Sequence, residues 1–75
     1  MNQITIYELL PLLRPGYVAM EKYGIWYWYA HKPVPDNIGI WISLSDGDLY
    51  ELGAFNIVPF DGDWKDSLME CGGKK

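Results

Sequence analysis

The clearest structural signal in the chain is the alternation of tryptophan and tyrosine within residues 21–33, EKYGIWYWYAHKP. Four aromatic residues occupy the consecutive positions 26–29. Aromatic residues are enriched in strands, and the two-residue period of a strand sends the two tryptophans to one face and the two tyrosines to the other. This segment therefore predicts a β-strand that needs cover on both faces.

The residues before this strand are predicted to form a hairpin with it, from strands over 17–21 and 25–30. A three-residue loop that ends in a left-handed glycine places Met20 opposite Trp26. A two-residue turn would instead place Met20 opposite Tyr27 and force Tyr23 to a positive φ, so the three-residue loop is favoured. The predicted core of the hairpin is then Val18, Met20, Trp26 and Trp28.

The N-terminal segment carries the signals of a short helix. Thr5 and Glu8 have the spacing of a capping box, which predicts that the helix begins near Ile6. Pro11 should shorten or kink this helix, and the Pro-Gly pair that follows should end it. A strand over 3–7 is the alternative, because these residues also alternate. The apolar face that the helix would offer consists of Leu9, Leu10, Leu12 and Leu13.

The middle of the chain predicts two more strands after a stiff, proline-rich connection over 32–37. Neither proline of this connection has a backbone N–H that could donate to a neighbouring strand. Apolar alternation over 38–44 predicts a strand with Trp41 on the face opposite the main core. A turn at 45–48 leads to a returning strand over 49–52. The expected fold class is α+β: a small antiparallel meander of about four strands with a short N-terminal helix and a C-terminal helical turn. The residues expected to face the main core are Ile38, Ile40, Ile42 and Leu44.

A helical turn is predicted over 64–68, near the C-terminus. Asp63 or Asp61 can cap it, because an aspartate oxygen accepts from the free N–H groups of a first turn. Trp64 and Leu68 lie one turn apart on the same side. We therefore expect this segment to form a lid over the sheet.

The whole chain, 1–75, is predicted to be a single domain, because 75 residues leave no room for a second core. Gly72 should stop the last helical turn. Residues 72–75 contain no large apolar side chain and should form a disordered tail. Whether 56–60 extends the sheet or crosses it stays open.

Charge and composition narrow the classes of partner. Ten acidic and six basic side chains give a formal charge of −4, and no basic stripe is present, which disfavours nucleic acid. An acidic surface suits a protein that occupies a basic site on a partner. No apolar run approaches the roughly 20 residues of a membrane span, and the first residues lack the positive charge of a signal peptide. With Cys71 as the lone cysteine, we expect a cytoplasmic protein without a membrane partner.

The candidate chemistry is sparse. His31 and Cys71 could form a catalytic pair, but no motif surrounds either, so an exposed histidine and an incidental thiol are the favoured interpretation. Acidic clusters at 46–48 and 61–63 lack the ligand ladder of an EF-hand, and a turn and a helix cap account for them, with weak calcium binding as the alternative. The sequence therefore predicts no catalytic residues, no metal and no cofactor, and a protein that is not an enzyme.

The aromatic residues that face away from the main core are the best candidates for binding. An uncovered aromatic face marks a binding surface in many proteins. The alternative is structural cover, by a lid carrying Trp64 or by a second copy in a homodimer. The predicted binding residues are Tyr17, Tyr27, Tyr29 and Trp41.

Two short motifs resemble those of a group of small phage proteins. W-Y-x-Y-x-x-K-P over 26–33 and D-W-K-D-S-L over 63–68 resemble runs found in small uncharacterised proteins of tailed bacteriophages and prophages. The likeness spans roughly Tyr17 to Glu70, and this chain departs from the group after Leu68, where a basic residue and proline often follow. The resemblance implies a phage or prophage context and brings no catalytic residues.

These observations lead to three hypotheses of function. The first is a non-enzymatic phage or prophage accessory protein that binds a host protein in the bacterial cytoplasm, with inhibition of host defence as its effect. The second is a small-ligand or nucleotide-binding module, because aromatic rings can stack on a base without many basic residues. The third is a virion or assembly component.

Overall fold

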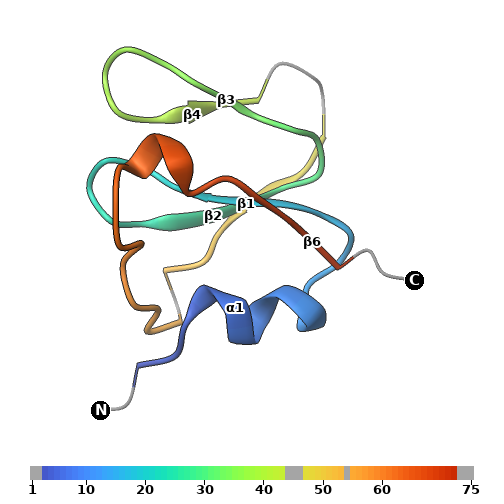
Figure 1. Ribbon diagram of the computed structural model, residues 1–75. Coiled ribbons are helices and arrows are strands. Elements are labelled where there is room, and N and C mark those ends of the chain that lie inside the picture. The colour runs from blue at the N-terminus through green and yellow to red at the C-terminus, as the bar shows by residue number, and fades with distance from the viewer. Residues whose placement is uncertain (1–2, 44–46, 54, 73–75) are drawn as a thin grey trace.

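The computed structural model describes residues 3–43, 47–53 and 55–72. These residues form three layers, with a four-stranded antiparallel sheet in the middle (Figure 1). The helix α1 (Ile6–Leu9), continued by a 3-10 turn (Leu10–Leu12), lies on one face. A two-stranded ribbon and a second 3-10 turn (Trp64–Asp66) lie on the other. The predicted α+β class, with a short N-terminal helix and a C-terminal helical turn, is confirmed.

The strands of the central sheet follow one another in the order β5-β2-β1-β6. The strand that was predicted to return after the turn at 45–48 pairs with β2 and is β5. The C-terminal segment supplies the fourth strand, β6, which pairs with β1. The antiparallel sheet of four strands is as predicted, whereas the simple meander order is wrong, because both edge strands are recruited from the second half of the chain. The four strands are β1 (Gly16–Met20), β2 (Trp26–Tyr29), β5 (Leu49–Glu51) and β6 (Met69–Cys71).

The central hairpin of β1 and β2 has the predicted register, with Met20 opposite Trp26. The Glu21 N–H donates to the Ile25 carbonyl at 3.0 Å, which closes a three-residue loop. Gly24 ends that loop at a φ of 94°, in the left-handed region that glycine adopts without strain. The alternative pairing of Met20 with Tyr27 is therefore wrong.

The helix begins at Ile6, as the capping signal predicts. The Glu8 carboxylate accepts from the Thr5 N–H at 3.1 Å, and the Glu8 N–H donates back to the Thr5 carbonyl at 3.1 Å. Pro11 lies in the 3-10 turn that follows, which keeps the helix short. Leu9 is buried, but Leu12 is 78% exposed, so the predicted apolar face is only partly used.

The first residues do not form the alternative strand over 3–7. Ile4 makes only an isolated parallel bridge to Ile57. Its N–H donates to the Asn56 carbonyl at 2.9 Å, and its carbonyl accepts from the Val58 N–H at 2.8 Å. The segment 56–60 therefore runs beside the N-terminal residues and does not join the central sheet.

The proline-rich connection contains a strand, contrary to the prediction. β3 (Val34–Pro35) pairs with β4 (Trp41–Ile42) in a separate ribbon that lies over the sheet. Trp41 is buried against the sheet, as predicted, whereas the isoleucines before and after it do not reach the main core. The exposed fractions are 69% for Ile38, 39% for Ile40 and 40% for Ile42. Leu44 and the first two residues of the predicted turn at 45–48 lie outside the described residues.

The C-terminal lid is confirmed, but its limits differ from the prediction. Asp63 is the cap, since its carboxylate accepts from the Lys65 N–H at 3.1 Å. The 3-10 turn ends at Asp66, well before Gly72, because the chain then extends to pair with β1. Gly72 is held in place: its φ is 64° and its N–H donates to the Leu10 carbonyl at 3.1 Å. The predicted tail is therefore wrong at this residue, and 73–75 lie outside the described residues.

Ser67 joins the lid to the sheet. Its side chain is fully buried, and its hydroxyl accepts from the Met20 N–H at 2.8 Å. The same hydroxyl lies 2.7 Å from the Trp64 carbonyl and 3.1 Å from the Met20 carbonyl, and donates to one of them. A side chain thus continues the pairing of β1 beyond the point where β6 begins.

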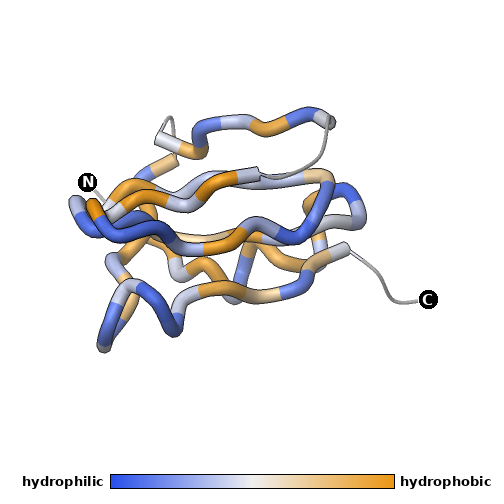
Figure 2. The backbone as a smooth tube through the Cα atoms, turned by 90° about the horizontal axis from the view of Figure 1, so that it is seen from above, coloured by the Kyte–Doolittle hydropathy of each residue, from blue (hydrophilic) through white to orange (hydrophobic). Residues whose placement is uncertain are grey.

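Each face of the sheet has its own apolar cluster. The face toward α1 carries the main core, which contains all four predicted hairpin residues. The opposite face carries a smaller cluster of Ala19, Tyr29 and Trp41, with Tyr27, Trp64 and Leu68 packed around it. Figure 2 shows apolar and polar residues interspersed along the backbone of the layers. None of the helices in the described part of the chain is long and apolar enough to cross a membrane.

Candidate binding pockets beside the β5 edge

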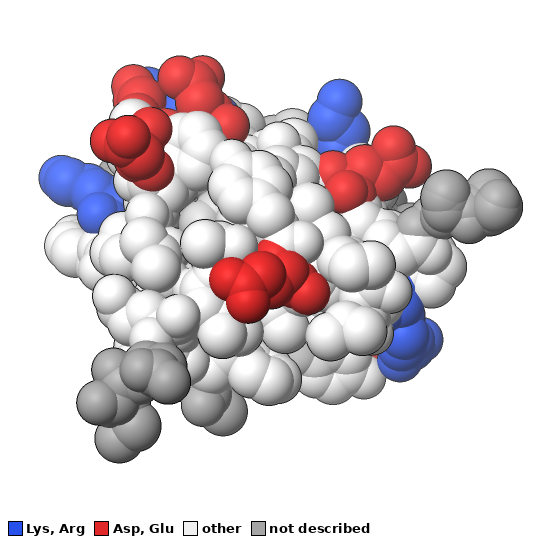
Figure 3. All heavy atoms as spheres, turned by 60° about the horizontal axis from the view of Figure 1, so that its bottom comes forward, with Lys and Arg blue, Asp and Glu red and all other residues white. Residues whose placement is uncertain are grey.

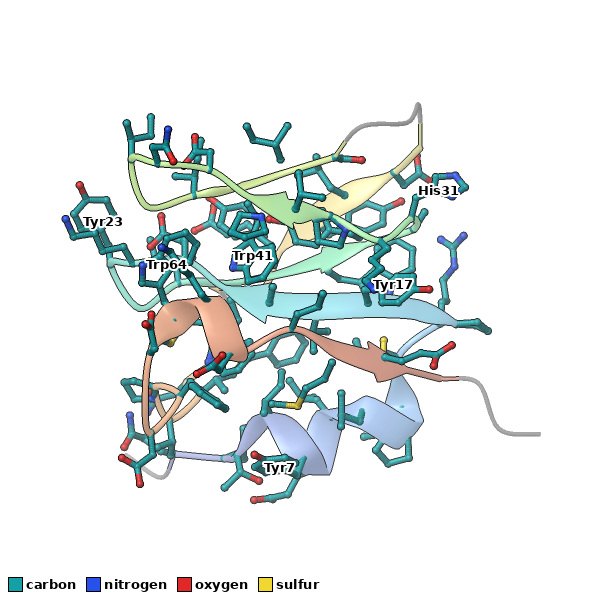
Figure 4. The ribbon with its side chains drawn as sticks, turned by 45° about the horizontal axis from the view of Figure 1, so that its top comes forward. Tyr7, Tyr17, Tyr23, His31, Trp41 and Trp64 are labelled. Carbon is teal, nitrogen blue, oxygen red and sulfur yellow. The ribbon has the colours of Figure 1, made fainter. Side chains whose placement is uncertain are left out.

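The structure brings three of the four predicted binding residues together. Tyr29 and Trp41 are only 3% and 7% exposed, and Tyr27 is partly buried beside them. Tyr17 is the cross-strand partner of Tyr29 in the β1–β2 pairing, but it lies away from Trp41 and Trp64 (Figure 4). The Trp64 ring meets the Trp41 ring edge to face, with centroids 5.7 Å apart, so the lid provides the structural cover that was the alternative interpretation.

A pocket of about 170 Å³ remains between this face of the sheet and the ribbon. We call it the aromatic pocket. Its aromatic walls come from β2 and from Trp41 of β4. Its lining residues are Glu21, Tyr27, Tyr29, Ile40, Trp41 and Leu49.

Negative charge and protonated phenols characterise this pocket. Glu21 is 8% exposed, and its Oε1 accepts from the N–H groups of Tyr23 at 2.9 Å and Ile25 at 3.3 Å. Burial, followed by the neighbouring Tyr27 and the charge of Glu21, raises the pKa of Tyr29 to about 12. Burial also raises the pKa of Tyr27, with Glu51 and Glu21 adding to the shift. Both hydroxyls are therefore neutral near pH 7, and the carboxylates supply the charge.

A second, more open pocket of about 320 Å³ lies on the α1 side of the sheet, and we call it the apolar groove. Trp28 stacks on Tyr50 in its floor, with centroids 5.5 Å apart, and the Arg14 guanidinium lies 5.3 Å from the Trp28 ring. The face seen from the α1 side is largely uncharged, with acidic groups in a few separate places and basic groups toward its margins (Figure 3). The lining residues are Leu12, Leu13, Arg14, Trp28, Tyr50, Glu51, Leu52 and Phe55.

The sequence did not predict this groove. Leu12 was expected in the helix core, yet it is 78% exposed, and Phe55 is 48% exposed. Tyr50 was expected only as part of a returning strand and is 50% exposed. The position of a returning strand at the edge of the sheet decides these exposures, and no local pattern encodes that position.

The strand β5 separates the two pockets and has an open edge. The Asp48 carbonyl accepts from the residue after β2 at 2.9 Å, and the Leu52 N–H donates to β2 at 2.8 Å. In an antiparallel pair such bonds recur at every second residue, so the N–H and C=O groups of Leu49 and Glu51 point away from the sheet. β5 is an edge strand of the sheet, and within the described segments no other strand pairs with these outward groups.

Cys71 and His31, the two candidate catalytic residues, lie in different environments. Cys71 is buried, its thiol donates to the Arg14 carbonyl at 3.5 Å, and burial raises its pKa, which disfavours a nucleophilic thiolate. His31 lies at the exposed end of the sheet near the ribbon (Figure 4). Over residues 3–43, 47–53 and 55–72, no three His, Cys, Asp or Glu side chains gather as metal ligands.

Comparison with known proteins adds no relative from which an activity could be carried over. No protein-family model, curated protein or solved structure matches this chain.

Proposed function

We propose that this protein acts by binding, without catalysis, and that its partner is a host protein that adds an extended segment to the edge of β5. The observation that supports this proposal best is the open edge of β5 with a pocket on each face. The motifs that resemble phage and prophage proteins support a bacterial host as the source of the partner and its cytoplasm as the place of action. Inhibition of host defence would follow if the host segment that pairs with β5 belongs to a defence protein.

Strand addition explains why both pockets border the same strand. Main-chain hydrogen bonds to an exposed edge supply affinity, and pockets for alternate side chains supply specificity. Tyr50 faces the apolar groove and Leu49 faces the aromatic pocket, because neighbouring side chains of a strand point to opposite faces. A partner strand beside β5 would therefore place its own alternate side chains over the two pockets.

The apolar groove would contribute most of the affinity. Tyr50 and Phe55 are about half exposed, and large aromatic side chains at the centre of an interface contribute about 2 kcal/mol or more each. A contiguous apolar patch on a small protein often marks such an interface. Phe55→Ala should therefore weaken partner binding and leave the fold largely intact.

A nucleotide is a weaker candidate for the aromatic pocket. The carboxylate of Glu21 repels phosphate, and the volume of about 170 Å³ lies below the roughly 300 Å³ at which small-molecule sites usually begin.

The test is affinity capture from a bacterial lysate with a matched pair of edge variants. Glu51→Pro removes an N–H that points away from the sheet, so the ladder to β2 stays intact. Glu51→Ala removes the same side chain but keeps the N–H, and the difference between the two isolates the edge donor. We expect one stoichiometric protein with the wild type and with Glu51→Ala, and its loss with Glu51→Pro at an unchanged thermal midpoint.

Two results would contradict the proposal. Equal capture of the partner by Glu51→Pro and by wild type would exclude strand addition at β5. A co-purifying nucleotide, with no stoichiometric protein, would favour the ligand-binding alternative.

A further inference from the structure

We infer that the aromatic pocket is a binding site for an organic cation, a quaternary ammonium or alkylammonium head group. This inference concerns the aromatic pocket alone, and it holds whether or not a strand adds to β5. It combines three observations: a buried carboxylate without a counter-ion, aromatic walls fixed by the fold, and a volume that suits a small head group.

The carboxylate of Glu21 carries an unpaired charge. Its two hydrogen bonds come from backbone N–H groups of the hairpin turn, and both go to Oε1. The neighbouring Lys22 directs its ammonium to the Tyr23 ring, 5.9 Å from the centroid, and no lysine or arginine of the described residues forms an ion pair with Glu21. A carboxylate that is 8% exposed and lines a pocket attracts a cation, because burial makes an uncompensated charge costly.

The aromatic walls suit a cation that is large and weakly hydrated. The Tyr27 and Tyr29 rings lie 6.1 Å apart at an interplanar angle of 34°, and Trp41 closes the pocket from the ribbon. Ring faces attract ammonium groups through their quadrupole, and Trp does so best. Charged inorganic ions are less suitable, because Ca²⁺ needs 6–8 oxygen ligands and the described residues offer no such cluster here.

The walls are held in place before any ligand binds. The Trp41 indole N–H donates to the Met20 carbonyl at 2.9 Å, and the Trp64 ring packs against the Trp41 ring. Tyr29 is 3% exposed and has little freedom to move. A pocket whose side chains are already ordered loses little conformational entropy when a ligand enters.

The volume limits the ligand to a head group. The pocket measures about 170 Å³, and an engineered protein cavity of about 150 Å³ holds benzene. A group such as tetramethylammonium is of this size class, whereas a whole nucleotide is not. The two tyrosine hydroxyls stay protonated and add no charge of their own, so Glu21, with Glu51 near Tyr27, defines the potential.

The experiment is an NMR titration of the whole chain with tetramethylammonium chloride. We expect saturable shifts of the Tyr27 and Tyr29 amides and of the Trp41 indole. Sodium chloride at the same concentration controls for ionic strength, and tert-butanol controls for an uncharged group of similar shape. Neither control should produce saturable shifts at these three residues.

Variants then separate charge from shape. Glu21→Gln keeps an oxygen that can accept from the turn but removes the charge, and we expect about tenfold weaker binding, which equals about 1.4 kcal/mol. Glu70→Gln, on the exposed far edge strand, removes the same charge elsewhere and should change the affinity less than twofold. Tyr27→Phe should keep binding and Tyr27→Leu should lose it, because the ring is the attractive element.

The source of the cation is distinguished by comparing choline with a blocked trimethyl-lysine residue. Tighter binding of the lysine compound would identify a protein side chain as the natural ligand, and tighter binding of choline would identify a free cation; both carry the inferred chemistry. The inference is overturned if tetramethylammonium gives no saturable shift or if tert-butanol gives the same shifts. It is also overturned if the affinity of folded Glu21→Gln equals that of wild type; should that variant not fold, equal affinities of Tyr27→Leu and Tyr27→Phe would overturn it instead.

Discussion

Removal of a single hydroxyl, that of Ser67, should destabilise the whole sheet. The Ser67 oxygen accepts from the Met20 N–H at 2.8 Å in a site that solvent does not reach. Pairing between β1 and β6 has its last partner pair at Val18 and Met69, so no backbone group of β6 replaces the hydroxyl. Ser67→Ala therefore leaves a buried donor of the central strand without an acceptor.

The expected loss can be set against the total stability. A buried unsatisfied donor costs about 1–3 kcal/mol. A protein of 75 residues has a free energy of unfolding of about 4–11 kcal/mol, at 0.05–0.15 kcal/mol per residue. A loss of about 2 kcal/mol should lower the thermal midpoint by about 8–16 °C, since each kcal/mol shifts a domain of this size by about 4–8 °C.

Thermal unfolding and amide hydrogen exchange together test this reasoning. The midpoint of Ser67→Ala should fall as stated, and the Met20 amide should exchange faster relative to its neighbours in β1. Asp63→Ala is the matched control, because it weakens the same lid by about 1 kcal/mol through the helix cap and leaves the Met20 bond intact. A wild-type midpoint in Ser67→Ala, with slow exchange at Met20, would refute the structural role of the hydroxyl.

Three further predictions follow from the packing and the charges. Trp28→Ala should cost about 3–5 kcal/mol and leave little folded protein by circular dichroism, because the ring fills the main core and its N–H donates to the Arg14 carbonyl at 3.0 Å. Gly72→Ala should lower the stability in urea by about 1–3 kcal/mol, because its φ is 64° and a Cβ would collide with the Leu13 carbonyl; an unchanged midpoint would contradict this. The raised pKa of Tyr29 makes its contribution to stability complete below pH 10 and lost as the pH rises from 10 to about 12, which ultraviolet tyrosinate titration alongside unfolding would show. Glu21→Gln should lower the pKa of Tyr29 in the folded protein, so that the loss of stability becomes smaller and ends at a lower pH.

Local signals explain why the central hairpin could be predicted from the sequence. The turn ends in Gly24, which supplies the positive φ, and the two-residue period then determines every pairing from Met20 and Trp26 onward. The start of α1 and the cap at Asp63 are equally local, since each depends on residues within one turn. In these places the side chains that specify the geometry are neighbours in sequence.

The edges of the sheet could not be predicted in the same way. β6 pairs with β1 directly after the bond between Ser67 and Met20, and these two residues are far apart in the chain. β5 pairs with β2 in preference to β4, and no turn chemistry specifies that choice. The apolar groove and the open edge are products of these long-range pairings, which is why the sequence predicted part of the aromatic pocket and none of the groove.

The orientation of the ribbon shows how far an alternating pattern can be interpreted. Alternation places Trp41 and the isoleucines on opposite sides of β4, but it does not say which side faces the protein. α1 and Ile57 already cover the main core, and the ribbon packs on the opposite face, where Trp41 joins the smaller cluster and meets the Trp64 ring. With Trp41 inward, Ile42 must face solvent, at 40% exposure. The same choice makes the Trp41 indole line the aromatic pocket together with Glu21, so this pocket depends on the ribbon burying its tryptophan.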